Sequence, residues 1–126
     1  MNGWLAIAAG GALGSVLRAL LARWQPWPGL PLSILLVNVL GSLAIGLLWG
    51  WLHSRGPAAD SLLWNAVGIG LLGGFTTYST HALDVLRLLE AGRILPALGY
   101  AFGTLLLALL ACAAGLALAR NLAGPG

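Results

Sequence analysis

The chain has 126 residues, of which 60% are hydrophobic and 7% are charged, and its mean hydropathy is +0.94. Soluble domains carry about 25% charged residues, so this composition excludes an ordinary soluble domain and indicates that a lipid bilayer surrounds the chain. The net charge of +3 comes from arginines scattered singly along the sequence, whereas a nucleic-acid-binding protein would gather basic residues on one face. We therefore expect no nucleic-acid partner.

Four apolar runs, each long enough for the roughly 20 residues that a spanning helix needs, predict four transmembrane helices. The expected spans are residues 3–23, 31–53, 61–88 and 94–120, in one four-helix domain over residues 1–126. The first run opens without Arg or Lys, unlike a signal peptide, so we expect it in the mature protein. The sequence thus predicts an all-α, multi-pass membrane protein.

The breaks between the spans are short and carry turn residues or charge: RWQPWPGLP, HSRGPAAD and LLEAGRI. All six tryptophans lie near the predicted ends of the spans. Tryptophan favours the two water–lipid interfaces, so these positions support the predicted boundaries.

Small residues four positions apart recur in every predicted span. Such spacing lets the backbones of membrane helices approach closely. Four short helices form a thin bundle, so a pore or transport path would need a second copy of the chain. The pairs are Gly10 and Gly14, Gly46 and Gly50 (with Ser42 one turn earlier), Gly70 and Gly74, and Gly99 and Gly103.

The arginines give almost no preference for one orientation in the membrane. With four spans, both termini share a side with Arg55 and Arg120, and the other side carries Arg23 and Arg93, with Arg87 nearby. The positive-inside rule orients a membrane protein by an excess of basic residues on its cytoplasmic side. So small a difference predicts dual topology and an antiparallel homodimer.

One polar side chain interrupts each of the first two spans. Arg18 either extends to the membrane surface near Trp24 or attracts anions to a vestibule. Asn38, near the middle of the second span, either links two helices or donates hydrogen bonds to an anion. The residues alone leave both pairs of alternatives open.

The third span contains the segment GLLGGFTTYSTHALD, the densest polar stretch of the chain. Adjacent glycines weaken a helix, and threonines compete for its backbone hydrogen bonds, so we expect a helix break near Gly73–Thr77. Irregular backbone at membrane depth occurs only where it is buried in protein or lines a cavity. Freed carbonyls there would suit a small cation and half-helix ends an anion, and a plain kink without any ion remains an alternative.

Beyond the expected break, polar side chains recur at helical spacing. Tyr78, His81 and Asp84 lie three apart and share one helix face. His81 is a candidate ligand, proton carrier or hydrogen-bond donor. In the fourth span, Tyr100 and Thr104 lie four apart and either extend a polar track or bond locally to other helical groups.

With these residues assembled, the chain resembles the Fluc/CrcB family of bacterial fluoride channels. GGALGSVLR, ending in Arg18, resembles the family's first-helix glycine motif. VNVLGSLAIG resembles the second-helix pattern with its pore asparagine, and GLLGGFTTYST resembles the third-helix break. The resemblance covers nearly the whole chain in length, number of spans and order of motifs.

The resemblance implies a dual-topology homodimer in the bacterial inner membrane, with two antiparallel pores that passively and selectively export fluoride, and no enzymatic activity. Asn38 would be a pore donor, Arg18 a vestibule charge, and Thr104 a hydroxyl on the fourth-helix polar track. Gly73 and Thr76 would each give a backbone carbonyl to a structural, non-transported Na+ at the dimer centre.

The chain departs from the family pattern where two phenylalanines, three residues apart, usually face fluoride. Tyr78 keeps an aromatic ring with a positive edge, and His81 replaces the second ring with an N–H donor. We therefore expect flux to vary with pH near the ordinary histidine pKa of about 6.5. Ala108 stands where the family often has another hydroxyl, so the polar track is shortened.

Two other kinds of protein, and one other assembly within the same family, could share these features. A small multidrug cation/proton antiporter also has four short helices, but it needs a membrane-embedded carboxylate, and the first span has none. A haem-anchoring subunit would use His53 and His81 as axial ligands, yet one lies at a span end and the other lies deep. A pair of differing subunits from the same family remains an alternative to the homodimer.

Overall fold

The computed structural model describes residues 2–56 and 61–125, and within them every regular element is helical. Three continuous helices are long and apolar enough to cross a membrane: α1 (Gly3–Ala22), α2 (Leu32–Ser54) and α6 (Ile94–Ala123). The third predicted span is a series of shorter helices: α3 (Ser61–Leu63), η1 (Trp64–Leu72), α4 (Gly73–Phe75) and α5 (Tyr78–Glu90). The all-α prediction is confirmed, and the third span is the discontinuous one.

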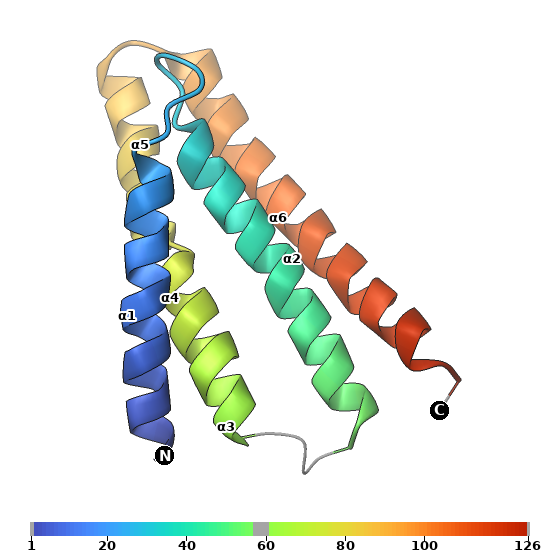
Figure 1. Ribbon diagram of the computed structural model, residues 1–126. Helices are drawn as coiled ribbons and strands as arrows, with labels where there is room; N and C mark the ends of the chain where they lie inside the picture. The colour runs from blue at the N-terminus through green and yellow to red at the C-terminus, as the bar shows by residue number, and fades with distance from the viewer. Residues whose placement is uncertain (1, 57–60, 126) are drawn as a thin grey trace.

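The helices form two packed pairs. α1 packs along η1 and α4, and α2 packs along α6. The two pairs diverge toward the end of the bundle where both chain termini lie, while α5 leans on α6 at the opposite end (Figure 1). The four crossings alternate in direction, as four spans with short connections require.

Glycines make close approach possible within each pair. A Cβ added at Gly10 or Gly14 would overlap the carbonyl oxygens of Ala66 or Leu71 on the facing helix. At the other pair, a Cβ at Gly46 would overlap the carbonyl of Cys112. Bare backbone on one side of each contact lets the helix axes come close, as small residues do in membrane bundles.

The third span breaks at Thr76 and Thr77, inside the stretch where a break was expected. Both residues are extended, with φ/ψ of −82°/156° and −151°/121°. Thr77 then restarts the helix as the N-cap of α5, because its Oγ1 accepts a hydrogen bond from the backbone N–H of Thr80 at 3.2 Å. The adjacent Gly73 and Gly74 stay helical.

The helix before the break is wound as a π-helix over Trp64–Leu72. π-helical turns are rare and occur mostly within α-helices near functional sites. Here the widened turns run along α1 and lead directly into the break. Sequence periodicity did not predict this feature.

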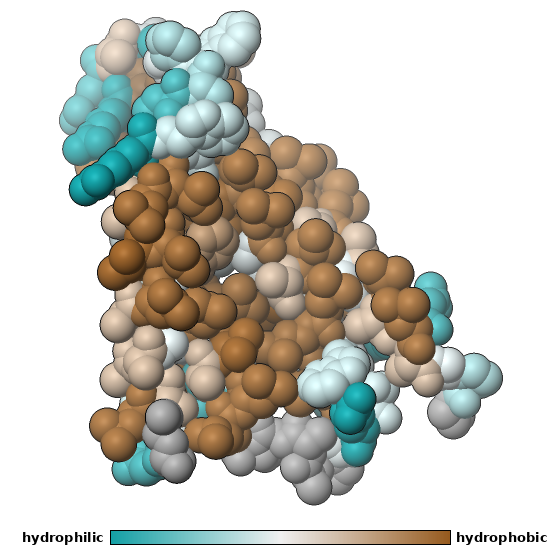
Figure 2. Space-filling view, in the orientation of Figure 1, coloured by the Kyte–Doolittle hydropathy of each residue, from teal (hydrophilic) through white to brown (hydrophobic). Residues whose placement is uncertain are grey.

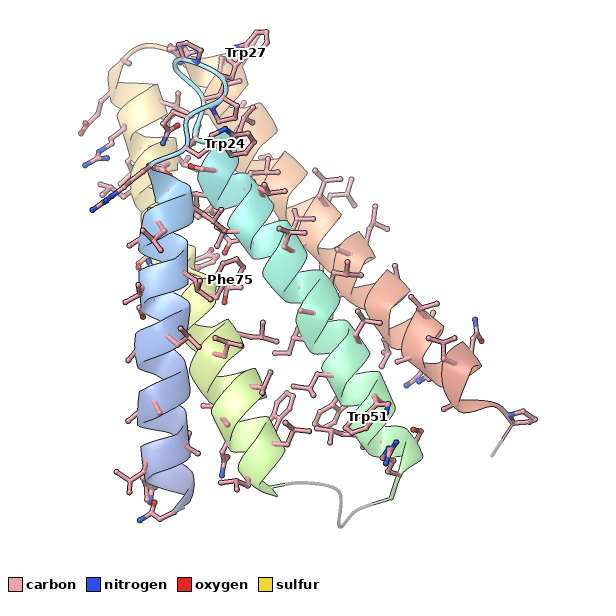
Figure 3. All side chains as sticks on the ribbon, viewed as in Figure 1. Trp24, Trp27, Trp51 and Phe75 are labelled. Atoms are coloured by element: carbon pink, nitrogen blue, oxygen red, sulfur yellow. The ribbon has the colours of Figure 1, made fainter. Side chains whose placement is uncertain are left out.

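The surface agrees with a membrane location. On the face shown in Figure 2, apolar side chains form a broad band across the middle of the molecule, and polar ones gather toward its two ends. Trp24 and Trp27 lie at one end of the bundle and Trp51 lies toward the other (Figure 3), and all three are more than 40% exposed. This arrangement matches aromatic belts at two interfaces.

Candidate functional site

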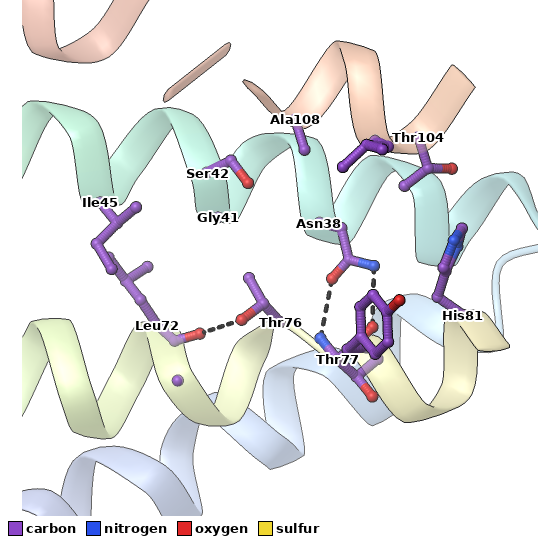
Figure 4. A pocket seen from close by; sticks show the side chains of 13 residues that line it. Asn38, Gly41, Ser42, Ile45, Leu72, Thr76, Thr77, His81, Thr104 and Ala108 are labelled. Carbon is purple, nitrogen blue, oxygen red and sulfur yellow. Dashed lines mark hydrogen bonds between the residues drawn. The ribbon is translucent and has the colours of Figure 1, made fainter. Parts of the chain in front are cut away.

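The break in the third span borders a cavity of about 290 Å³. Its walls come from α2, from the two sides of the break, and from α6 (Figure 4). Most of the lining is apolar, so the few polar groups stand out. They are Asn38, Ser42, Thr76, Thr77, Tyr78, His81 and Thr104.

The structure brings most of the predicted site residues into this one cavity. Asn38, Tyr78, His81 and Thr104 line it, as do Gly73 and Thr76, the two residues assigned to the cation. Ala108 lines it too, where a hydroxyl was noted as missing. Predicted residues from α2, from α4 and the break, from α5 and from α6 therefore meet at one cavity.

Arg18 does not line the cavity. Its Nε donates a hydrogen bond to the carbonyl oxygen of Gly74 at 3.1 Å, from the α1 side of the break. The side chain is partly buried, so it is placed beside the helix end and not fully extended to the membrane surface. A role as vestibule charge stays a prediction.

Asn38 pairs with the backbone of Thr77. Its Nδ2 donates to the Thr77 carbonyl oxygen at 3.0 Å, and its Oδ1 accepts from the Thr77 N–H at 2.9 Å. The interhelical-link alternative is thus realised in the structure. The amide nitrogen carries two hydrogens, and only one of them serves this pair, so a donor remains for an occupant of the cavity.

Two buried polar atoms of the cavity have no hydrogen-bond partner among the described residues: Oγ1 of Thr104 and Nδ1 of His81. Thr104 is only 4% exposed. An unpaired buried polar atom costs about 1–3 kcal/mol, and such atoms commonly mark the place of a bound ion or water. Their convergence on one cavity indicates a small polar occupant.

Aromatic rings surround His81. Its ring centroid lies 4.8 Å from that of Tyr100 and 6.1 Å from that of Tyr78. Tyr100 is buried, and its hydroxyl donates to Oδ2 of Asp84 at 3.3 Å. Tyr78, in contrast, is 85% exposed, so the cavity has an aromatic wall that this single chain leaves uncovered.

Backbone carbonyls at the break are the available cation ligands. The N–H and Oγ1 of Thr76 both donate to the Leu72 carbonyl, at 3.0 and 2.9 Å. Within the described segments no hydrogen bond reaches the carbonyl oxygens of Gly73 or Thr76, because the break removes their helical donors. Among the described residues no group of three His, Cys, Asp or Glu side chains could hold a metal ion, and these carbonyl oxygens are the candidate cation ligands.

Sequence reasoning missed two lining residues. Ser42 follows Asn38 by four positions on α2 and lines the cavity beside it, so helical spacing could have identified it. Thr77 lines the cavity and also forms the backbone pair with Asn38. Only the long-range contact between α2 and the break reveals that second role.

Known proteins similar to this chain include several ion channels, and a family model also matches it. The family model described as "CrcB-like protein, Camphor Resistance (CrcB)" matches residues 5–116. The "Fluoride-specific ion channel FluC 2" of Nocardia farcinica is 46% identical over 118 residues, covering 92% of this chain and 84% of its own length. The "Fluoride-specific ion channel FluC" of Stutzerimonas stutzeri is also 46% identical, covering 91% and 94%. The protein with the same name in Paracoccus denitrificans is 46% identical over 123 residues, covering 94% and 95%.

Proposed function

The chain belongs to the CrcB family, and on that basis we propose that it forms a fluoride-selective channel that passively exports fluoride across a bacterial inner membrane. The observation that carries this proposal is the cavity at the helix break, where two buried hydrogen-bonding atoms, on Thr104 and His81, lack a partner among the described residues. The fluoride-channel names of the relatives support the choice of ion. The chain is a channel and not an enzyme.

The cavity offers donors that replace the water of a small, strongly hydrated anion. These are the Thr104 hydroxyl, the second N–H of Asn38, and the positive edge of the Tyr78 ring. The N-terminal end of α5 adds a positive partial charge at the same place. Each contact alone is weak, which suits conduction, because an ion must leave a site as readily as it enters.

The functional unit is an antiparallel homodimer. Tyr78 is 85% exposed in the single chain, and a second copy would cover it and close the cavity against lipid. Reporter fusions at the C-terminus test this arrangement. Reporters on both sides of the membrane agree with dual topology, and a C-terminus found on one side only would rule it out.

A structural Na+ would be held at the dimer centre by the carbonyl oxygens of Gly73 and Thr76 from each copy. Oxygen ligands suit a hard cation. Gly73 is exposed, and a Cβ added there would meet only ordinary contact at 3.8 Å within its own chain. Packing within its own chain does not require glycine at this position, which is consistent with close approach by a second copy. Gly73→Ala should therefore fold as a chain but weaken dimerisation in Na+.

The deciding experiment is fluoride efflux from liposomes that contain only this chain, followed with a fluoride electrode. Rapid fluoride release without chloride release is the expected result. A parallel assay with a quaternary ammonium ion tests the small multidrug antiporter, which was the alternative. Absence of fluoride movement would refute the proposed function, and movement only after a second family member is added would replace the homodimer by a pair of differing subunits.

A further inference from the structure

We propose that fluoride and a proton bind the cavity together, with the proton on His81, so that the occupied site contains a fluoride–imidazolium pair. This inference rests on the proposed function and specifies what accompanies the ion. As fluoride enters, Nδ1 or Nε2 of the neutral imidazole takes one proton from water. When fluoride leaves, that proton returns to water.

The His81 side chain has a hydrogen-bonding atom beside the cavity that no described residue uses. It lines the cavity, and its Nδ1 is buried and has no partner among the described residues. Among the described residues no acceptor reaches Nδ1, so an N–H on this ring would gain a partner from an anion in the cavity. Fluoride is the strongest acceptor of this size, so its arrival favours the doubly protonated ring.

Among the described residues that line the cavity, His81 is the one side chain of a type that titrates close to neutral pH. α5 packs against α6 and α2. The ring of Tyr100 on α6 lies beside that of His81, and α2 contributes the neutral amide of Asn38 to the same cavity. The remaining ionisable or charged side chains of these three helices are Tyr78, Asp84, Arg87, Glu90, His53, Cys112 and Arg120.

Electrostatic attraction also favours a protonated His81 beside fluoride. A lone anion in an apolar cavity is strongly disfavoured unless it is paired. An imidazolium in contact with fluoride leaves the pair neutral. The Asp84 carboxylate, held by the Tyr100 hydroxyl at 3.3 Å, lies one turn beyond His81 on α5 and further favours a positive ring. Arg18 is less suited to this pairing, because it lies outside the cavity lining and bonds to Gly74.

Calorimetric titration of the purified protein with sodium fluoride tests this proposal. The heat is measured at pH 7.5 in three buffers with different ionisation enthalpies, and its slope against those enthalpies counts the protons. We expect about one proton taken up per fluoride bound. Above the pKa of the free histidine, the apparent affinity should fall by up to about tenfold for each unit of pH.

Matched variants identify the group. His81→Phe and His81→Gln should both abolish proton uptake and flatten the pH dependence, and the Gln variant retains an N–H donor and a polar side chain if Phe impairs folding. His53→Gln removes the other histidine, which is exposed at the far end of α2 and stacks on Trp49. That control should keep the full uptake.

Each outcome separates this inference from the proposed function. Liposomes that release fluoride while the buffer slope is zero would overturn proton co-binding and leave the channel standing. A slope that survives in His81→Gln would overturn the assignment to His81. Absence of fluoride release together with absence of binding heat would overturn both proposals.

Discussion

The amide of Asn38 and the backbone of Thr77 join two parts of the chain that lie 39 positions apart. Thr77 is extended and has left the helical hydrogen-bond pattern, so its N–H and C=O need other partners. Asn38 supplies both from α2. One side chain thus holds the helix break in place and lines the cavity that the break creates.

Asn38→Leu should destabilise the fold. The change leaves two partly buried backbone groups of Thr77 unpaired, each costing about 1–3 kcal/mol. Thermal unfolding in detergent should show a clear drop in the midpoint. Ser42→Ala is the matched control, since Ser42 lines the same cavity one turn further along α2. Equal midpoints for both variants would contradict the role given to the Asn38 pair.

Thr104→Val should separate function from stability. The two side chains have nearly the same shape, and the hydroxyl has no partner in the described chain, so unfolding should change little. Fluoride efflux should fall roughly tenfold, as expected for the loss of one hydrogen bond worth about 1.5 kcal/mol. A variant that unfolds more easily yet conducts normally would show that the hydroxyl is only structural.

Gly14→Ala should disrupt the pairing of α1 with the third span. A Cβ there overlaps the Leu71 carbonyl and crowds the Phe75 N–H, both of which are backbone atoms that cannot move aside. Gly99→Ala on α6 meets nothing within 4 Å and serves as the control. We expect poor yield and a loss of about 2 kcal/mol or more for Gly14→Ala, within the range for overpacked sites. Equal folding yields of the two variants would argue against this packing.

Two variants of Arg18 test whether its charge or its directed hydrogen bond matters. Arg18→Ala removes the donor to the Gly74 carbonyl, and we expect a loss of about 1–3 kcal/mol in stability, as for a hydrogen bond from a charged group. Arg18→Lys keeps the charge but lacks the Nε donor and should restore flux only partly. Efflux and unfolding measured together decide the matter, and wild-type behaviour of Arg18→Ala in both would exclude either role.

Much of the fold was predictable because a bilayer permits few backbone structures. Long uncharged runs must form helices that satisfy their own backbone groups, so α1, α2 and α6 lie close to their expected bounds. The break was also expected, from the adjacent glycines and the threonines together, and only Thr76 and Thr77 leave the helix. Gly73 and Gly74 remain helical, and Gly74 instead packs tightly on the backbone of Gly11, a contact between helices that local propensity does not contain.

For the site, the sequence predicted most of the polar lining residues but not the long-range contacts. His81 and Thr104 were named from helical spacing and family position, and the structure places both at one cavity. The contact of Arg18 with Gly74 and the pairing of Asn38 with Thr77 were not predicted. Both join residues that are far apart in the sequence, and their geometry depends on how α1 and α2 sit against the break.

The break at Thr76 and Thr77 also fixes the permitted length of this segment. Each residue of an α-helix turns the chain by about 100°. One residue inserted between Thr77 and Tyr78 would therefore rotate all of α5 about its axis and carry Tyr78 and His81 away from the cavity, while η1 and α4 stayed in place. The two extended residues thus set the rotation of α5 relative to α4. We therefore expect this part of the chain to tolerate substitutions far better than insertions or deletions.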